Sequence, residues 1–180
     1  MKFNNRENPV HKIGDKTIWE SRSVAVNLVV VIQDTIYPEN YVLVSKRGPN
    51  AADNRGKYNL VAGYLDWDET ASEAFIRETW EECGLDLLKT LKENTITQNN
   101  LVQPWHVQTD PASSRQNVSL RYGVKLLSTK GTFPALNTDN NEVEGEVEDP
   151  QWMPVSKIDN YEWAFDHDKL IKEYISKRHE

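Results

Sequence analysis

One apolar run constrains the fold of this chain more than any other feature of its sequence. It covers residues 23–33 (SVAVNLVVVIQ), is rich in β-branched side chains and is nearly unbroken in its apolar character. The run is too short to cross a bilayer. Such a run is typical of a central strand that is buried on both faces. We therefore expect a sheet with this strand in its interior.

Other segments predict partners for this strand. Residues 41–46 (YVLVSK) follow a Pro-Glu-Asn turn, and residues 58–62 form a short strand-like segment that we expect to stop at Gly63. Between them, residues 47–57 are rich in Gly, Asn and Asp, which predicts a loop. Further strands are expected at residues 105–108, 118–127 and 147–154.

Two helices are expected, and the clearer one covers residues 70–83. Thr70 and Glu73 have the spacing of a capping box, and Gly84 is a suitable C-terminal stop. A last helix is expected to begin with Asp166 as its cap and to run to about Lys177. Strands that flank one helix, with a second helix at the end, predict a mixed α/β layered domain.

The length and charge of the chain limit its organisation. Its 180 residues fit one domain with a short appendage. Residues 1–22 are polar, and Gly14 and Asp15 favour a small hairpin there. We therefore expect an N-terminal extension, residues 1–22, and a single domain, residues 23–180. The formal charge of −7 has the wrong sign for a general nucleic-acid surface, so no stable nucleic-acid complex is expected.

Cysteine usage and apolar runs indicate the compartment. Cys83 is the one cysteine, which excludes an intrachain disulfide framework and a thiolate zinc site. The first residues lack the apolar stretch of a signal peptide, and no later run approaches the roughly 20 residues that span a bilayer. We expect a soluble protein of the cytoplasm with no membrane partner.

Three acidic residues in the helix at 70–83 are the first candidates for chemistry. On a helical wheel, Glu78, Glu81 and Glu82 continue the stripe that Ala74 and Phe75 use for packing, so their carboxylates should point toward the protein body. Like charges at this spacing repel each other and require neutralisation. Mg²⁺ binds carboxylates together with water and phosphate oxygens, so the stripe predicts a magnesium site for phosphate chemistry.

The alternative interpretation is a solvated helix with internal salt bridges. Glu73 and Glu81 each lie four residues from Arg77 and are expected to pair with it. That pairing accounts for one of the three acids in the stripe and leaves two without a counter-charge.

Residues 63–85, GYLDWDETASEAFIRETWEECGL, resemble the signature of the Nudix hydrolases. The positions that match are Gly63, Glu69, Arg77, Glu78, Glu81, Glu82, Gly84 and Leu85. Thr79 departs from the pattern, because an aliphatic residue is usual there; Thr is β-branched and of similar size, so this weakens packing more than chemistry. The order of strands and the closing helix also resemble the α/β/α sandwich of the family, which has a mixed β-sheet.

The resemblance implies roles for individual residues. An arginine and a glutamate at the positions of Arg77 and Glu69 hold the loop against the helix. The glutamates at Glu78, Glu81 and Glu82 bind Mg²⁺, for which Mn²⁺ is a possible substitute, and the carbonyl of Gly63 adds a ligand. The family also recruits an acid outside this segment as a ligand or general base. The candidates are Glu142, Glu144, Glu146 and Glu148, of which Glu142 and Glu146 are preferred; a solvated acidic loop is the alternative for most of them.

The implied activity is Mg²⁺-dependent hydrolysis of a phosphoanhydride bond in a nucleoside diphosphate linked to a further group, such as an ADP-sugar, a dinucleotide or a nucleoside triphosphate. We expect water to attack phosphorus, with Glu78 or an acid of residues 142–148 as general base. A non-catalytic nucleotide sensor is an alternative, and a prenyl-diphosphate isomerase a more distant one. A homodimer is expected because the family is often dimeric.

Substrate contacts must come from outside the signature. Arg47, Arg55 and Lys57, with Lys46, surround the loop before Gly63 and are candidates for phosphate contacts. Trp105 is a candidate for stacking on a base, as are Tyr122 and Trp152, although aromatic side chains are more often buried in a core. Gln116 and Asn117 are candidates for reading a polar edge of the ligand. His106 and His167 lack ligand spacing and need no catalytic role.

Overall fold

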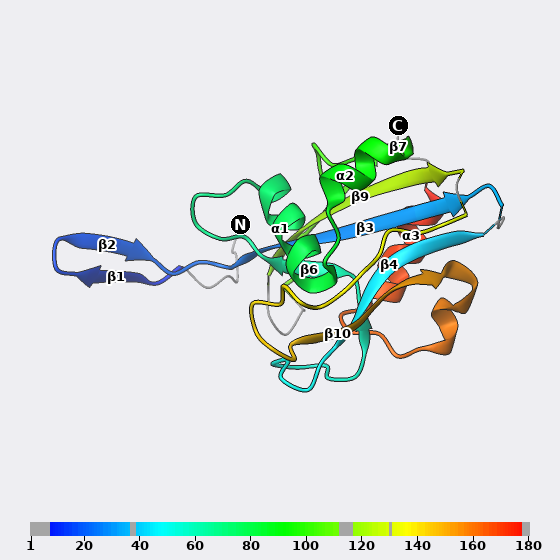
Figure 1. Ribbon diagram of the computed structural model, residues 1–180. Helices are drawn as coiled ribbons and strands as arrows, with labels where there is room; N and C mark the ends of the chain where they lie inside the picture. Colours follow the sequence, from blue (N-terminus) through cyan, green and yellow to red (C-terminus); the bar gives the residue numbers. More distant parts are fainter. Residues whose placement is uncertain (1–7, 37–38, 112–116, 130, 178–180) are drawn as a thin grey trace.

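The computed structural model describes residues 8–36, 39–111, 117–129 and 131–177. In these residues the elements follow one another along the chain (Figure 1). They are β1 (Val10–Ile13), β2 (Lys16–Trp19), β3 (Val24–Asp34), β4 (Asn40–Arg47), β5 (Tyr58–Asn59), β6 (Val61–Tyr64), α1 (Ala71–Cys83), α2 (Leu87–Glu93), β7 (Thr95–Asn100), β8 (His106–Gln108), β9 (Val118–Ser128), β10 (Val147–Pro154), the 3-10 helix η1 (Val155–Asn160) and α3 (His167–Ser176).

The main sheet is mixed and has eight strands among the described residues. Its path runs β10-β4-β3-β9-β7, with β5 on β4, β6 on β3 and β8 on β9. The long strands β3 and β9 are parallel and stay in register from Val24 opposite Val118 to Asp34 opposite Ser128. The other pairs are antiparallel. The predicted central strand is confirmed, because β3 lies inside this sheet.

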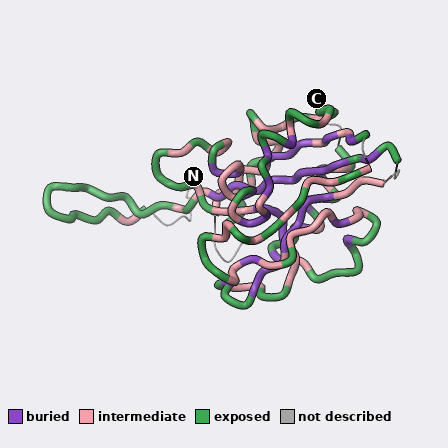
Figure 2. The backbone as a smooth tube through the Cα atoms, viewed as in Figure 1, coloured by how far each residue is buried: buried purple, intermediate pink, exposed green. Residues whose placement is uncertain are grey.

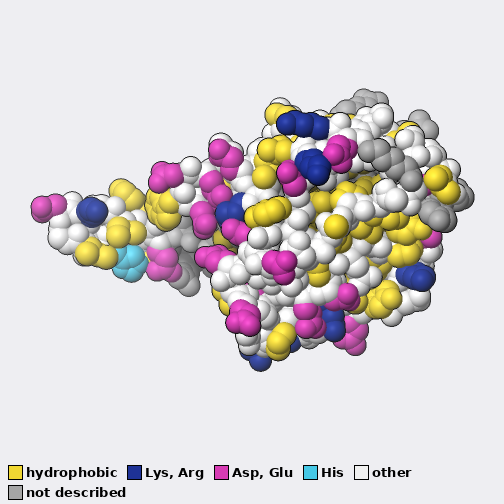
Figure 3. All heavy atoms as spheres, viewed as in Figure 1, with side chains coloured by type: hydrophobic (Ala, Val, Ile, Leu, Met, Phe, Trp, Pro, Cys, Tyr) yellow, Lys and Arg dark blue, Asp and Glu magenta, His cyan; other side chains and the backbone are white. Residues whose placement is uncertain are grey.

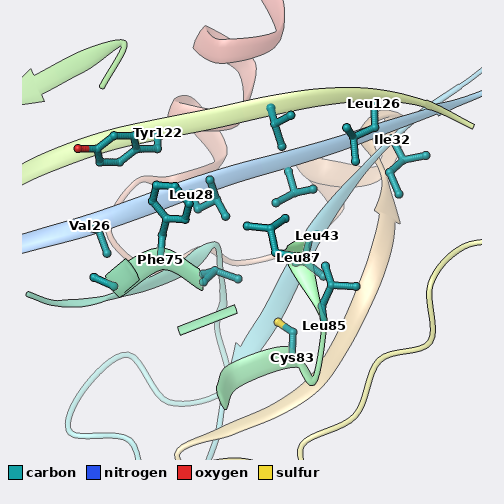
Figure 4. Close-up of a cluster of buried hydrophobic side chains, with 14 residues drawn as sticks. Val26, Leu28, Ile32, Leu43, Phe75, Cys83, Leu85, Leu87, Tyr122 and Leu126 are labelled. Carbon is teal, nitrogen blue, oxygen red and sulfur yellow. The ribbon is translucent and has the colours of Figure 1, made fainter. Parts of the chain in front are cut away.

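The side chains of β3 separate two cores. Val26, Leu28, Val30 and Ile32 pack on one face of the sheet with side chains of α1 and α2, including Phe75 and Leu87 (Figure 4). Val29 and Val31 pack on the opposite face with side chains of η1 and α3, including Ile171 and Tyr174. Helices thus cover both faces of a mixed sheet, and the predicted α/β/α sandwich is confirmed.

Helix α1 begins and ends as its sequence predicts. Thr70 is the N-cap and accepts from the Glu73 amide, while the Glu73 carboxylate accepts from the Thr70 amide. Gly84 ends the helix in the left-handed conformation at φ 63°. Thr79 is buried, and its hydroxyl donates to the carbonyl of Phe75, which satisfies the polar atom at this departure from the family signature.

Several boundaries differ from the prediction. The short strand does not stop at Gly63: it is split into β5 and β6, and β6 continues to Tyr64 because its residues pair with β3. Asp166 is the N-cap of α3 by position, but its side chain makes no cap hydrogen bond and pairs with Lys169 at 2.8 Å. Helix α2 and strand β7 were not predicted, because α2 is a short helix and β7 is polar and mostly exposed.

The N-terminal strands β1 and β2 form a separate two-stranded sheet that extends away from the main sheet (Figure 1). Gly14 lies in the turn between them at φ 60°. Every residue of the two strands is exposed, in contrast to the buried strands of the main sheet (Figure 2). The division of the chain into an extension, residues 1–22, and a domain remains a proposal.

Candidate active site

A cavity of about 950 Å³ opens between the carboxyl half of α1, the edge of the main sheet and the start of α3. Residues from most parts of the domain line it. Those that carry polar or charged groups include Asn27, Arg47, Asn59, Asp66, Arg77, Glu78, Glu81, Glu82, Gln108, Asn117, Arg121, Asn141, Glu142, Glu146, Asp166, His167, Lys169 and Glu173. Its volume is within the range of small-molecule sites.

The acidic stripe of α1 faces this cavity, as its helical spacing predicts. Glu82 is buried, and one of its carboxylate oxygens accepts a long hydrogen bond of 3.4 Å from the Ala62 amide. The Glu78 side chain is 13% exposed and the Glu81 side chain 25%. A Cβ atom on Gly63 would overlap the Glu78 carboxylate, so glycine is required if that carboxylate is to lie against β6.

Arg77 connects two of these three acids, Glu78 and Glu81, with the preceding loop. Its Nε and Nη2 donate to the two oxygens of Glu69 at 3.1 and 2.8 Å, a bidentate pair. Its Nη1 donates to Glu78 and Glu81, each at 2.9 Å, and its Nη2 also reaches the Tyr64 carbonyl at 3.2 Å. The predicted pairing with Glu81 is confirmed.

The predicted pairing of Arg77 with Glu73 is wrong. The carboxylate of Glu73 is used at the helix start, where it accepts from the amide and the hydroxyl of Thr70, each at 2.7 Å. A cap bond inside the first turn leaves that side chain pointing toward the helix start and away from Arg77.

Hydrogen bonding and burial shift the pKa values of these carboxylates in opposite directions. Hydrogen bonds from Arg77 lower the pKa of Glu69. Burial raises the pKa of Glu78 to about 7 even though Arg77 opposes the shift. Burial also raises the pKa of Glu82 well above its usual range, and the neighbouring Glu78 adds to the effect. Burial therefore favours the protonated form of both groups, and ionising them together requires a nearby positive charge.

Glu78, Glu81 and Glu82 provide some of the ligands that a divalent cation needs. Among the described residues, no three His, Cys, Asp or Glu side chains already converge as a metal site, because Arg77 holds one oxygen each of Glu78 and Glu81. The second oxygens of those side chains and the buried carboxylate of Glu82 remain as hard ligands. Mg²⁺ needs only one or two carboxylates besides water and phosphate oxygens, so the donor set suits it.

The acids outside the signature separate into two groups. Glu142 and Glu146 line the cavity, and the charge of Glu146 contributes to the raised pKa of Glu82. Glu148 lies outside the lining and pairs with Lys46 at 3.1 Å, while the backbone carbonyl of Glu144 accepts from Asn50. The two preferred candidates for a further acid are therefore the two that reach the cavity.

Of the four cations predicted to contact phosphates, only Arg47 is in the lining. It is buried, donates to the Asp53 carbonyl at 3.0 Å, and places its guanidinium 5.6 Å from the ring centre of Phe165. Arg55 donates to the Ala51 carbonyl at 2.7 Å and does not line the cavity, nor does Lys57.

The aromatic candidates for base stacking lie in the protein core instead of the cavity. Trp105 packs on Tyr174 with ring centres 5.5 Å apart and donates to the Tyr122 carbonyl. Tyr122 packs on Phe75, and Trp152 donates to the Pro134 carbonyl. Of the two candidates for a polar edge, Asn117 lines the cavity and Gln116 lies outside the described residues.

Other lining residues were missed by sequence reasoning. Asn27 interrupts the apolar run of β3, and this polar interruption was a usable signal. Phe165 and Asp166 both have positive φ, 57° and 56°, a strained conformation of the kind that occurs at binding sites. His167 is buried, and its Nδ1 accepts from the Leu60 amide at 3.0 Å. Arg121, on β9, had no local signal.

The fold and this site define a class: an α/β/α protein with an acidic helix beside a cavity of small-molecule size. The NUDIX domain pattern matches residues 22–174. The chain therefore belongs to the Nudix family.

Solved structures show the same fold. The NUDIX domain of NrtR from Shewanella oneidensis, complexed with ADP ribose, is 17% identical, with 87% of this chain and 88% of that chain covered and a TM-score of 0.58. An Ap4A hydrolase from C. elegans is 14% identical over 84% and 96%, with a TM-score of 0.57.

A bifunctional NMN adenylyltransferase/ADP ribose pyrophosphatase from Francisella tularensis is 21% identical, with a TM-score of 0.61. The match covers 87% of this chain and 41% of that longer protein. Within the described residues of this chain, no helix combines the length and the apolar character that crossing a membrane requires.

Proposed function

We propose that the protein is a Mg²⁺-dependent hydrolase that cleaves a phosphoanhydride bond in a nucleoside diphosphate linked to another group. The observation that carries this proposal is the pair of buried carboxylates, Glu78 and Glu82, whose pKa values are raised by burial at the wall of a large cavity. Buried acids of this kind are costly unless a cation or a proton neutralises them, and they occur most often at functional sites.

The proposed ligands of the cation are the carboxylates of Glu78, Glu81 and Glu82, with the carbonyl of Gly63. When bound, Mg²⁺ or Mn²⁺ would supply Lewis-acid activation and charge neutralisation at the diphosphate. Arg77 orients two of the carboxylates through its Nη1 and keeps the loop at Glu69 against α1. In this role it is a positioning residue.

Proton transfer in the proposed reaction needs a base close to the attacked phosphorus. Glu78 is the proposed acceptor of the proton of the attacking water, because its carboxylate lines the cavity beside the proposed cation site. Glu142 and Glu146 line the same cavity and are the alternatives. Replacement of each with Gln, followed by the pH dependence of kcat, identifies the base: the correct variant loses the lower pH limb as well as most of its rate.

The substrate proposal follows from the cavity. Its volume accommodates a nucleotide with a second moiety, and Arg47 is the proposed phosphate contact. An ADP-sugar, a dinucleotide and a nucleoside triphosphate are the candidate substrates, and the similar proteins include a NUDIX domain complexed with ADP ribose, an ADP ribose pyrophosphatase and an Ap4A hydrolase. Arg55, Lys57 and Trp105 lie outside the lining and have no role in this proposal. A cytoplasmic location stays a prediction from the sequence.

The alternatives make different predictions. A nucleotide sensor would bind these compounds without turnover. An isomerase of prenyl diphosphates would need an accessible cysteine, whereas Cys83 is fully buried in the core and its thiol pKa is raised by burial.

The test is incubation of the purified chain with Mg²⁺ or Mn²⁺ and a panel of ADP-sugars, dinucleotides and nucleoside triphosphates, with chromatography of the products. Release of a mononucleotide or phosphate that stops in excess chelator is expected. Binding of a compound by calorimetry without any release would contradict hydrolysis and support the sensor.

A further inference from the structure

Arg121, on β9, carries a charge at the cavity wall that the proposed hydrolysis does not use. Its side chain is 20% exposed, and its Nε is buried without a hydrogen-bond partner among the described residues. Burial lowers the pKa of the guanidinium, which stays protonated because arginine does not lose its proton in proteins. A buried charge with an unpaired donor is costly, and an anionic ligand would satisfy both the charge and the donor.

The one ion pair that Arg121 makes within the described ranges is with Glu173, on α3, and it is loose. Nη1 of Arg121 lies 3.8 Å from Oε2 of Glu173, which is beyond hydrogen-bond distance. The other carboxylate oxygen of Glu173 contacts Lys177, so two cations share this acid. Next to burial, the charge of Arg121 is the largest cause of the lowered pKa of His167. Glu173 therefore leaves part of the charge of Arg121 uncompensated.

Hydrogen-bond donors on neighbouring strands surround Arg121. The register of β3 and β9 places Asn27 opposite Arg121, and Ser119 lies two residues earlier on the same face of β9. Gln108 of β8 lies opposite Ser119. Its Oε1 is 3.3 Å from the His106 ring, so its amide nitrogen is the group available for a ligand. Arg121, Asn27, Ser119 and Gln108 all line the cavity, and we call them the distal subsite.

Two strand spacings separate the distal subsite from the acidic end of the cavity. Asn27 pairs with Arg121 on one side and with Ala62 of β6 on the other. The amide of Ala62 donates to Glu82. Adjacent strands are about 4.8 Å apart, so the Cα atoms of Arg121 and Ala62 are separated by about 10 Å. A diphosphate held at Glu82 therefore leaves the distal subsite to the next group of the substrate.

The distal subsite differs in sign from much of the molecule. The chain has a formal charge of −7, and Asp and Glu side chains gather on the part of the domain next to the N-terminal hairpin (Figure 3). Within the cavity, Glu78, Glu81 and Glu82 lie at the α1 end. An anionic group of a ligand is repelled by these acids and attracted to Arg121, where burial strengthens the interaction.

A phosphate group suits the distal subsite better than a neutral group or a carboxylate. The guanidinium, two side-chain amides and a hydroxyl are all donors. The outer oxygens of a phosphate ester accept from donors in several directions, whereas the oxygens of a carboxylate lie in one plane. A neutral sugar would leave the charge of Arg121 uncompensated.

We propose that the distal subsite binds a phosphate group on the second moiety of the substrate, so that the preferred substrate is a nucleoside diphosphate linked to a phosphorylated group. This inference rests on the proposed hydrolysis for the position of the diphosphate. Arg121 is then a specificity-determining residue, and Glu173 weakens phosphate binding because its negative charge lies beside Arg121. If the two side chains only fastened α3 to the sheet, neither would affect the choice of ligand.

The first test measures phosphate binding without catalysis. Orthophosphate is added to the full chain in excess EDTA, with the ionic strength kept constant by chloride, and its affinity is obtained from the rise in unfolding temperature. Arg121→Gln should bind orthophosphate about tenfold more weakly than wild type, because it loses a charge-assisted contact. Glu173→Gln should bind it more tightly. The matched control is Arg55→Gln, which removes an exposed arginine outside the cavity and should equal wild type.

The second test measures substrate choice with Mg²⁺ present. ADP-ribose is compared with ADP-ribose that carries a phosphate on its distal ribose, a pair that differs in this group alone. Wild type should hydrolyse the phosphorylated compound with a kcat/KM about tenfold higher, mainly through a lower KM, because the added contact forms in the ground state as well as in the transition state. Arg121→Gln should hydrolyse both compounds alike, with a kcat close to that of wild type on ADP-ribose.

Equal orthophosphate affinity of wild type and Arg121→Gln would overturn the inference. Weaker binding by Glu173→Gln would also overturn it, because the pair would then be structural. If acetate stabilises wild type as much as orthophosphate does, the subsite recognises a carboxylate and the phosphate assignment is wrong. Should Arg121→Gln not fold, Glu173→Gln and the two compounds on wild type decide the matter.

The two tests separate this inference from the proposed function. Hydrolysis of both compounds by wild type with equal kcat/KM would contradict the distal subsite and leave hydrolysis intact. If neither compound is hydrolysed, the proposed function fails for these substrates, while the orthophosphate titration still decides the role of Arg121.

Discussion

Gly63 shows how the absence of one side chain determines where a carboxylate lies. Its neighbour across the cavity wall is the Glu78 carboxylate, which a Cβ would overlap. The position has ordinary backbone dihedrals, since it is absent from the residues with positive φ. Glycine is therefore required because a side chain would not fit there. A substitution should displace the Glu78 carboxylate and leave the backbone unchanged.

Gly63→Ala is expected to displace the Glu78 carboxylate and to lower kcat/KM about 100-fold, because a shift of about 1 Å at a reacting group costs this much. The measurement is steady-state hydrolysis, with thermal unfolding as the check on the fold. In a Glu78→Gln background the same change should cost little more. A full additional 100-fold loss there would show that Gly63 acts independently of Glu78.

The buried imidazole of His167 should make the stability of the folded protein sensitive to acid. Burial, and next the charge of Arg121, lower its pKa from 6.5 to about 3. Between these pH values the unfolded chain binds a proton that the folded chain does not, so stability is complete above about 6.5 and falls as the pH drops toward 3. The hydrogen bond from Leu60 to Nδ1 requires the same neutral form.

His167→Asn keeps an acceptor near the position of Nδ1 but does not titrate. We expect wild type to lose about 2–3 kcal/mol more than this variant between pH 7.5 and pH 4.5, measured by urea unfolding. Glu78 and Glu82 have raised pKa values and act with the opposite sign, so their contribution is lost as the pH rises. They are present in both proteins and cancel in the difference. Equal acid sensitivity of the two proteins would contradict the assignment.

At the scale of elements, α1 is the part that carries the site, and its first turn is stabilised by side chains that never reach the cavity. Thr70→Ala removes the N-cap acceptor for the Glu73 amide and should lower the free energy of unfolding by about 1 kcal/mol. Thr70→Ser, which keeps the hydroxyl, should be close to wild type in chemical denaturation. An identical loss in both variants would assign the effect to the methyl group and not to the cap.

Most features of helix α1 could be predicted from the sequence. The capping box, Gly84 and the acidic stripe all lie within one continuous segment, so helical spacing alone placed Glu78 and Glu82 on the inner face. Strand β3 was predictable because a nearly unbroken apolar run of this length has few alternatives. Helix α2 and strand β7 were not, because β7 is polar and exposed and exists through its pairing with β9.

The rest of the site depends on contacts distant in sequence. Arg55 and Lys57 lie close to Arg47 along the chain, yet only Arg47 reaches the cavity, because the loop turns the other side chains elsewhere. Phe165 enters the cavity from the segment before α3 and Arg121 from β9, and local spacing contains no information about such a meeting.

In the whole molecule, helices cover both faces of a mixed sheet, and Arg77 compensates only part of the negative charge at the acidic end of the cavity. The remaining charge is the source of the proposed affinity for a divalent cation. Metal binding and stability must therefore be linked, because a ligand that binds only the folded state stabilises it by mass action.

Glu82→Gln is the variant that tests whether Glu78, Glu81 and Glu82 hold a divalent cation. In metal-free buffer this variant should unfold at the same temperature as wild type or a higher one, because it removes a buried carboxylate. Titration with Mg²⁺ should raise the unfolding temperature of wild type and release heat, while the variant shows neither effect. Equal Mg²⁺ stabilisation of the two proteins, or none in wild type with nucleotide present, would contradict the account.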